Sequence, residues 1–380
     1  MNGSLKKKFI ATAAYLTAKA GLGNSLMTSM SSIPRSVIRS IQQGGRFPYP
    51  REVQFEITMR CNLNCIMCHQ KKRRLEGAAD LSFASITKII DAIDTGCIRR
   101  IKLIGGEVFV RKDLLDILSS LEKRRIAVSI TTNGTLLTAA LAKELQRLPN
   151  LAGMVFSIDG MEHLHNQIRG LATGFAKTVA GLQEVSKFVP LTRITCVLQN
   201  DNLSDIEKLI QSGQEWGAAI ISIMLESFFT AEDLNATKRV LEGFGEVDFL
   251  VTPSSTAEYG FSLDQFLATV ATVSRLSKRL GVIAHLAPPV AAQAPEDFYH
   301  GEVFRHRKKL TCGYLNRLTI TDSGDVLACP FINLRFGNLL SQSLDDIWHS
   351  PQFTEYRRLF VAQGPFPICR RCCVLTFIKE

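Results

Sequence analysis

The sequence contains no run of about 20 apolar residues, the length that a membrane-spanning helix requires. Its first 51 positions also lack acidic residues, whereas eight Lys and Arg residues there carry +8 of the net charge of +10. The rest of the chain is therefore nearly neutral, and the pI of about 9.2 reflects an N-terminal arm. We expect no spanning segment and no nucleic-acid partner.

The basic arm, residues 1–51, leaves several interpretations open. Lys6, Lys7 and Lys8 precede an apolar stretch as in a signal peptide, but Lys19 interrupts that stretch. An organelle transit peptide and a helix lying on an anionic membrane surface are two further alternatives. A solvated or core-capping helix is the fourth. We expect a cytoplasmic protein, with peripheral membrane contact through the arm as the alternative.

Ten cysteines in 380 residues are too sparse for a disulfide-stapled secreted domain. Most of them are clustered, three within residues 61–68 and three within residues 369–373, with Cys312 and Cys329 ahead of the second group. Such clusters in a chain of this size indicate metal binding in a reducing compartment. Cys97 and Cys196 stand apart, at a predicted helix end and in an apolar strand, and are expected to be buried thiols.

Apolar runs alternate with amphipathic stretches through the first half of the chain. The runs predict strands near residues 53–57, 100–104, 127–131, 154–158, 194–198 and 219–223. Strands that alternate with helices form βαβ units, and hence a parallel sheet with helices on its outer face. Six units fit a partial barrel or an open wound sheet, and both bind ligands at the carboxyl ends of the strands.

The pattern changes after residue 225 and again at residue 310. We expect an α/β core over residues 52–225 and a connecting helical region over residues 226–309. That region contains an amphipathic helix at residues 263–280 and a linker, PPVAAQAPED, at residues 288–297. Residues 310–380 predict a small cysteine-rich unit with a β-hairpin around TDSGD and a short helix near residues 344–348.

The segment CNLNCIMC places Cys61, Cys65 and Cys68 directly after the first predicted strand. A loop with this spacing can wrap three corners of a cubane iron–sulfur cluster and leave the fourth iron open to a small molecule. A zinc site is the alternative, but structural zinc takes four ligands and His69 adjoins Cys68 too closely to supply one.

This segment resembles the C-x3-C-x2-C signature of the radical S-adenosylmethionine (SAM) superfamily, whose fold is a partial (β/α)6 barrel. The resemblance extends over about residues 53–223. It implies a 4Fe–4S cluster on Cys61, Cys65 and Cys68 with SAM on the open iron. The resemblance also implies reductive cleavage of SAM to a 5′-deoxyadenosyl radical, which abstracts hydrogen from the substrate.

The same resemblance implies a SAM site at the strand ends. Gly105 and Gly106 would let the backbone approach SAM, and Glu107 would pair with its ammonium group. Val108 follows where the family commonly has proline, with little expected effect. Two further strand ends contribute Asn133, Ser157 and Asp159 to the expected set. Arg169 completes it, since it resembles an arginine that contacts the SAM carboxylate.

The C-terminal cysteines resemble a shortened SPASM/twitch-type auxiliary domain with one cluster. The opening C…G-x4-C pattern carries this resemblance. It implies a second 4Fe–4S cluster, with a zinc ribbon as the alternative. The ligands that it implies are Cys312, Cys329, Cys369 and Cys372. Cys373 is the alternative to Cys372.

An auxiliary cluster can carry an electron, so we expect a net oxidation of a small metabolite or sugar-like substrate. An external donor such as flavodoxin or ferredoxin would reduce the first cluster. Modification of a ribosomal peptide is the alternative, although we expect no leader-binding domain ahead of Val53, and Met67 replaces an aromatic residue common in peptide maturases. A non-enzymatic cluster scaffold leaves the polar strand ends unexplained. Met224 and Glu226 are further candidates for substrate contact.

Overall fold

The computed structural model describes residues 47–378, apart from residues 51, 69, 76–78 and 252–258. Most of the basic arm lies outside the described residues, so its role stays a prediction. Within the described chain, no helix is both long enough and apolar enough to cross a membrane.

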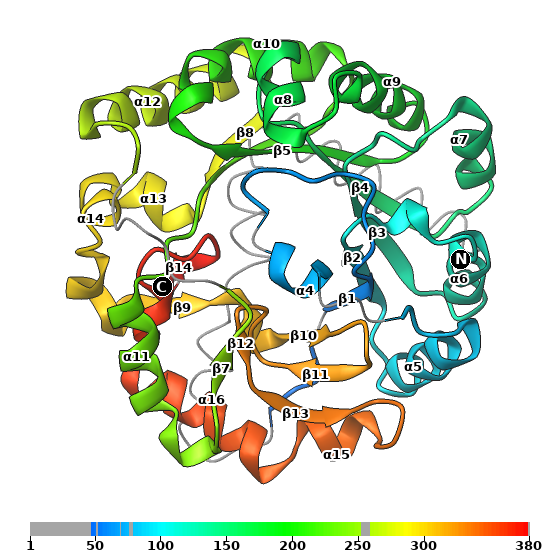
Figure 1. Cartoon of the computed structure of the whole chain (residues 1–380), viewed down its shortest axis with the longest axis vertical. Coiled ribbons are helices and arrows are strands. Elements are labelled where there is room, and N and C mark those ends of the chain that lie inside the picture. The colour runs from blue at the N-terminus through cyan, green and yellow to red at the C-terminus, as the bar shows by residue number, and fades with distance from the viewer. Residues whose placement is uncertain (1–46, 51, 69, 76–78, 252–258, 379–380) are drawn as a thin grey trace.

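One curved sheet of ten strands forms the frame of the molecule (Figure 1). Its strand order is β13-β11-β10-β1-β2-β3-β4-β5-β6-β8, and all neighbours from β10 to β8 pair in parallel. This confirms the predicted α/β class with a partial barrel. The first six strands are β1 (Glu52–Thr58), β2 (Arg100–Gly105), β3 (Ala127–Thr132), β4 (Leu151–Ser157), β5 (Leu191–Leu198) and β6 (Ile220–Leu225).

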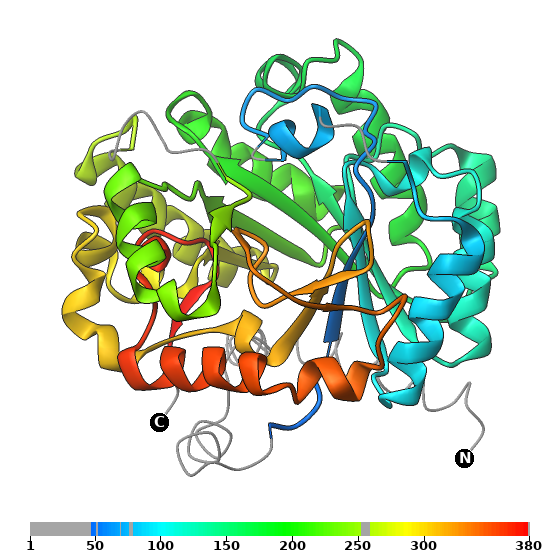
Figure 2. The ribbon, with the colours of Figure 1, turned by 60° about the horizontal axis from the view of Figure 1, so that its bottom comes forward.

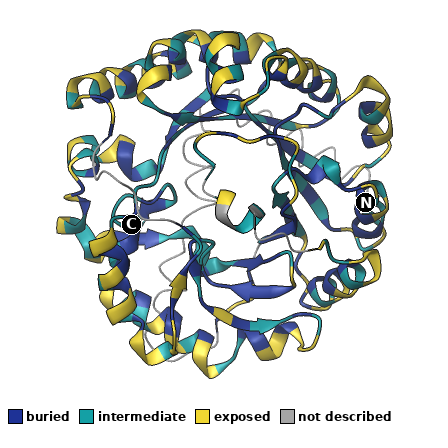
Figure 3. Cartoon of the chain, viewed as in Figure 1, coloured by how far each residue is buried: buried dark blue, intermediate teal, exposed yellow. Residues whose placement is uncertain are grey.

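Helices cover the outer face of this sheet and expose their far sides (Figure 3). Ile86, Ile89, Ile90 and Ile93 lie on one face of α5, and all four side chains are fully buried. Thr138 caps α7 through its hydroxyl, which accepts a hydrogen bond from the amide of Leu141. The covering helices are α5 (Phe83–Thr95), α6 (Leu114–Lys123), α7 (Ala139–Gln146), α8 (Glu162–Arg169), α9 (Gly174–Ser186), α10 (Ile206–Glu215) and α12 (Leu263–Leu280).

The sheet continues across the predicted boundaries at residues 225 and 309. β8 (Ile283–Ala287), inside the predicted connecting region, pairs in parallel with β6. β10 (Arg317–Ile320), from the cysteine-rich unit, pairs in parallel with β1 at the opposite edge of the core. The predicted hairpin of β10 and β11 (Asp325–Leu327) therefore extends the same sheet.

The remaining elements surround this frame. Figure 2 shows α4 and the loop before it at one end of the sheet and α16 across the other end. Two small antiparallel pairs join distant parts of the chain, β7 to β12 and β9 to β14. The elements are α4 (Lys71–Leu75), α11 (Ala231–Val240), β7 (Asp248–Phe249), β9 (Leu310–Cys312), β12 (Ile332–Asn333), β13 (Arg335–Asn338), α15 (Leu344–Trp348), α16 (Pro351–Gln363) and β14 (Leu375–Phe377).

Two local predictions were wrong. The segment predicted as a linker forms α13 (Pro289–Gln293) and α14 (Pro295–Tyr299), because proline is well suited to the first position of a helix. Cys97, predicted to be buried, is exposed, since it lies in the turn after α5 with a backbone φ of 56°. Cys196 is buried, as predicted.

Trp348 joins the segment before β1 to the C-terminal helices. It is fully buried, and its Nε1 donates to the carbonyl oxygen of Pro48 at 3.0 Å. Its ring packs against Phe47 and Phe353 at centroid distances of 5.7 and 5.2 Å. The guanidinium of Arg357 lies 3.8 Å from the centroid of the same ring, and burial lowers the pKa of Arg357 to about 9.

Trp348→Ala should destabilise the protein by about 3–5 kcal/mol, because it leaves a cavity and removes the aromatic face beneath a buried cation. Trp348→Phe should cost less, since it retains a ring. Denaturant unfolding of both variants measures the difference in the free energy of unfolding. Equal free energies for the Ala and Phe variants would contradict this role of the ring.

Candidate cluster and SAM site

The cysteine loop, residues 59–68, leaves the carboxyl end of β1 and carries the first three cysteines. The Sγ atom of Cys61 accepts a hydrogen bond from the amide of Leu63 at 3.4 Å. The amide of Ile66 donates to the carbonyl of Ile168 at 3.1 Å, which ties the loop to α8. Cys65 is buried, whereas Cys61 and Cys68 are partly exposed. Burial raises the pKa of Cys61.

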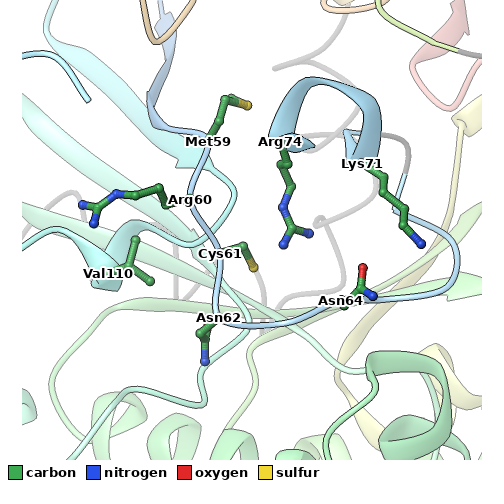
Figure 4. A pocket seen from close by; sticks show the side chains of 8 residues that line it. All are labelled: Met59, Arg60, Cys61, Asn62, Asn64, Lys71, Arg74 and Val110. Carbon is green, nitrogen blue, oxygen red and sulfur yellow. The ribbon is translucent and has the colours of Figure 1, made fainter. Parts of the chain in front are cut away.

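A cavity of about 500 Å³ opens beside this loop (Figure 4). Figure 4 shows Lys71 and Arg74 reaching from α4 toward the part of the loop that carries Cys61 and Asn64. Arg74 also donates to the carbonyl of Leu63 at 2.6 Å, and its other terminal nitrogen lies 3.8 Å from the Sγ of Cys68. The cavity is lined by Met59, Arg60, Cys61, Asn62, Asn64, Lys71, Arg74 and Val110.

Arg74, which was not predicted from the sequence, brings a positive charge to the thiol of the third cysteine. Its only sequence signal is the basic run KKRR shortly after the cysteine motif. A cation beside a thiol favours the thiolate, the form that ligates iron.

Gly105 and Gly106 form a turn that packs directly on the beginning of the cysteine loop. The Gly106 amide donates to the Thr58 carbonyl at 2.9 Å. A Cβ at Gly105 would lie 2.0 Å from that carbonyl oxygen, and one at Gly106 would lie 2.3 Å from the Arg60 oxygen. The close backbone approach that the two glycines permit is thus made to the protein's own loop.

Glu107 lies inside the protein and connects this turn to the end of β3. Its carboxylate accepts from the amide of Phe109 at 3.2 Å, the hydroxyl of Thr132 at 2.7 Å and the amide of Asn133 at 2.7 Å. Burial raises its pKa despite these bonds. The carboxylate thus fixes the site, and its predicted pairing with an ammonium group stays a prediction.

Asn133 links the end of β3 to the cysteine loop. Its amide nitrogen donates to the Oδ1 of Asn62 at 2.9 Å, and its own Oδ1 accepts from the amide and hydroxyl of Thr135. Asn62 in turn donates to the Thr135 hydroxyl at 2.9 Å. Since Asn62 follows Cys61 directly, this ring of hydrogen bonds orients the first cysteine.

Asp159 and Arg169 form a buried ion pair next to the second cysteine. Asp159 accepts from the Nε of Arg169 at 2.6 Å and from the amide of Val197 at 2.8 Å. A terminal nitrogen of Arg169 lies 3.8 Å from the Sγ of Cys65. Burial lowers the pKa of Arg169, but the charges of Asp159 and Cys65 and the hydrogen bonds to both together raise it, so this cation persists beside the thiol.

Three predicted contact residues lie at or just after the carboxyl ends of β4 and β6. Ser157, the last residue of β4, pairs with Thr195 of β5 and is partly exposed. Met224 lies near the end of β6, and Glu226 follows that strand. Burial raises the pKa of Glu226.

The five C-terminal cysteines gather into a second thiol group, which consists of Cys312, Cys329, Cys369, Cys372 and Cys373. Cys312 of β9 pairs in register with Leu375 of β14, two residues after Cys373. Burial raises the pKa values of Cys329 and Cys369, and the charge of Cys312 raises both further. A hydrogen bond between the adjacent thiols of Cys372 and Cys373 lowers the pKa of Cys373 to about 7. The choice between these two as the fourth ligand remains open.

These residues fit the two groups that the resemblance implies. Cys61 lines the cavity, and a separate cation lies close to each of the other two thiols of the loop, which suits a cluster that keeps one iron open. The second group has at least the four thiols that a closed cluster needs. No three metal-binding side chains among the described residues are close enough to surround a single ion. The corners of a four-iron cluster hold thiolates farther apart than one ion does.

Two family models match the chain. Residues 55–212 match the radical SAM superfamily, and residues 312–373 match SPASM, an iron–sulfur cluster-binding domain.

Three relatives align with most of the chain. The AdoMet-dependent heme synthase of Methanosarcina barkeri is 26% identical, over 84% of this chain and 88% of that protein. The PqqA peptide cyclase of Streptomyces rochei is 24% identical, over 85% of this chain and 81% of that protein. The subtilosin biosynthesis protein AlbA of Bacillus subtilis is 23% identical, over 84% of this chain but only 63% of its own length.

Solved structures share the fold. SuiB of Streptococcus suis has a TM-score of 0.62 at 16% identity, over 89% of this chain and 76% of its own. The protein anSMEcpe with bound AdoMet has a TM-score of 0.58 at 15% identity, over 80% of this chain and 82% of its own.

Gly106→Ala should destabilise the protein by about 1–3 kcal/mol and lower its iron content, because the new methyl group forces the cysteine loop away from β2. Gly243→Ala is the matched control, since a Cβ there meets no atom within 4 Å. Denaturant unfolding and iron analysis of both reconstituted variants test this. A Gly106→Ala protein with the stability and iron content of the control would refute the packing role.

Replacing Cys61, Cys65 and Cys68 together by alanine should reduce the iron content from about eight to about four atoms per chain, because the second thiol group keeps its cluster. Iron and sulfide analysis after anaerobic reconstitution measures this. A wild type with about four irons and one zinc would show that the second group holds zinc instead.

Proposed function

Because the chain belongs to the radical SAM superfamily and carries a C-terminal SPASM domain, we propose that it modifies a peptide by abstracting hydrogen from it. SAM and the first 4Fe–4S cluster, when bound, supply the 5′-deoxyadenosyl radical for this step. The observation that carries the peptide assignment is the similarity to PqqA peptide cyclase and AlbA, which extends over both domains. It favours a peptide over the sugar-like metabolite expected first from the sequence.

The chain's own residues have distinct roles in this proposal. Cys61, Cys65 and Cys68 hold the first cluster, and the cations of Arg74 and Arg169 favour the thiolate form of the cysteines beside them. In this proposal the turn and strand ends around the loop bind and orient SAM beside the cysteines. These residues are Gly105, Gly106, Glu107, Asn133, Ser157 and Asp159.

The second thiol group supports an oxidative outcome. Cys312, Cys329, Cys369 and Cys372 hold the auxiliary cluster in this proposal. The amide of the adjacent Cys373 donates to the hydroxyl of Ser227, just after β6, at 3.0 Å. A cluster held by these thiols would supply an acceptor for one electron during oxidation of the substrate. A flavodoxin or ferredoxin supplies the electron that starts the reaction, in the reducing cytoplasm.

A small-molecule substrate is the second candidate. One observation favours it: the heme synthase relative aligns with 84% of this chain and 88% of its own length. The two candidates differ in whether the substrate is cleaved by proteases, and this difference decides between them.

The test uses a cell extract from a culture grown on deuterated medium, with and without prior protease digestion. The reconstituted enzyme, SAM and dithionite are added, and mass spectrometry measures deuterium in the 5′-deoxyadenosine that is released. A peptide substrate should transfer deuterium from the intact extract, and digestion should reduce the transfer by at least about tenfold. The triple cysteine variant serves as the control for background exchange.

Unchanged deuterium transfer after digestion would overturn the peptide assignment in favour of a small molecule. Release of 5′-deoxyadenosine without deuterium from either extract would refute hydrogen abstraction from these substrates.

A further inference from the structure

A short helix brings a cation to the third cysteine. α4 has only five residues and lies inside the curve of the sheet, at the end from which the cysteine loop leaves (Figure 1 and Figure 2). A helix this short is not stable by itself in water, so its position depends on contacts with the rest of the protein. Two neighbouring arginines, Arg73 and Arg74, make these contacts with different partners.

Arg73 anchors α4 to two parts of the molecule that are far apart in sequence. One of its terminal nitrogens donates to the carboxylate of Glu56 in β1 at 2.8 Å, and the other donates to the carboxylate of Asp322 at 3.1 Å. Asp322 lies in the turn between β10 and β11, within the residues that match SPASM. Gln70 adds a longer contact of 3.4 Å between its side-chain amide and Glu56. The auxiliary domain thus contacts the helix through Arg73.

These ion pairs are sheltered from water. The side chain of Glu56 is 1% exposed, that of Asp322 is 11% exposed and that of Arg73 is 13% exposed. Salt screens sheltered pairs much less than exposed ones, so both pairs persist in solution. Because each carboxylate binds a different terminal nitrogen, the two together fix the plane of the Arg73 guanidinium. Loss of either carboxylate would leave that group free to turn about the remaining bond.

Arg74 is the next residue of the helix and lines the cavity beside the cysteine loop (Figure 4). One of its terminal nitrogens donates to the carbonyl of Leu63 at 2.6 Å, and the other lies 3.8 Å from the Sγ of Cys68. Its Nε is shielded from solvent and meets no hydrogen-bond partner in the described part of the chain. The guanidinium is therefore held at the loop by one strong bond to the backbone, with its charge beside a ligating thiol.

The direction of Arg74 depends on the anchor of Arg73. Successive residues of a helix point about 100° apart, so fixing one side chain sets the direction of the next. Arg73 reaches β1 and the turn between β10 and β11, and this leaves Arg74 directed at the cysteine loop. A rotation of α4 that released Arg73 would also move Arg74 away from Cys68.

The charge of Arg74 matters most for the reduced form of the first cluster. Reduction adds a negative charge, and a cation beside a ligating sulfur stabilises the more negative form. Charge and hydrogen bonds around the sulfurs are among the factors that set the reduction potential of a protein-bound cluster. A cation held beside Cys68 therefore makes the first cluster easier to reduce.

We propose that Arg73 is a positioning residue: held by Glu56 and by Asp322 of the auxiliary domain, it sets Arg74 against Cys68 and so raises the reduction potential of the first cluster. The inference rests on the proposed function, since it concerns the electron that starts that reaction. It gives the auxiliary domain a second role besides holding its own cluster, because Asp322 acts on the first cluster through α4.

Asp322 offers the sharpest test, because its direct and indirect effects have opposite signs. If its negative charge acted on the cluster only through space, removing it in Asp322→Ala would raise the potential. If it acts as an anchor, the same change lowers the potential, because Arg74 is no longer held against Cys68. Asp322→Asn keeps an oxygen that can accept from Arg73, so its potential should stay at or above that of the wild type.

A redox titration monitored by electron paramagnetic resonance measures the potential in the reconstituted protein without SAM. The signal of the first cluster is the one that disappears in the triple cysteine variant. The variants are Arg74→Leu, Asp322→Ala, Asp322→Asn and the double variant Arg74→Leu/Asp322→Ala. Glu355→Ala is the matched control, since Glu355 is an exposed carboxylate of α16 at the other end of the sheet. Iron content and thermal unfolding confirm that each variant is folded and loaded.

Arg74→Leu should lower the ratio of reduced to oxidised first cluster at a fixed potential by about tenfold, which is about 59 mV for one electron. Asp322→Ala should lower it by about threefold or more, roughly 28 mV, and should have no further effect in the Arg74→Leu background. Glu355→Ala should match the wild type. An unchanged or higher potential in Asp322→Ala would overturn the proposal. So would an equal fall with and without Arg74, or an equal fall in Glu355→Ala.

The titration needs no substrate, so its failure is distinct from failure of the proposed function. Deuterium transfer from a protease-sensitive substrate, combined with an unchanged potential in Asp322→Ala, would keep the peptide function and refute the positioning role. The expected potentials, combined with deuterium transfer that survives digestion, would keep the positioning role and contradict the peptide assignment.

Discussion

The position of the cysteine loop depends on a contact between two backbones. The amides of Gly106 and Glu107 donate to the carbonyls of Thr58 and Arg60, and there is no space for a side chain at either glycine. The Glu107 carboxylate accepts hydrogen bonds from Thr132 and Asn133, which connects the turn to the end of β3. Asn133 then returns to the loop through Asn62, beside the first cysteine. Three segments that are distant in sequence thus fix one another.

The second thiol group belongs to the same frame. Cys312 ends β9, and β10 follows a short turn later and pairs in parallel with β1. The auxiliary domain therefore pairs directly with the strand from which the cysteine loop leaves. This continuity keeps the two thiol groups in a fixed relation.

The sequence predicted what local patterns determine. The strand runs, the isoleucine face of α5 and the cysteine spacing all depend on neighbouring residues, and the fold class follows from them. The pairing of β10 with β1 joins residues far apart in the chain, which no local period encodes. The packing of the glycine turn on the cysteine loop was not predicted, because nothing in the motif shows this contact. Arg74 was missed since its role depends on where a five-residue helix folds back.

The central claim is that one chain holds two chemically different iron–sulfur clusters, one open to SAM and one closed by protein thiolates. Electron paramagnetic resonance of the reduced, reconstituted protein with and without SAM tests it most directly. The account predicts two cluster signals, of which SAM changes only one, and the changed signal is lost when Cys61, Cys65 and Cys68 are replaced by alanine. A single signal in the wild type, or two signals that both change with SAM, would contradict it.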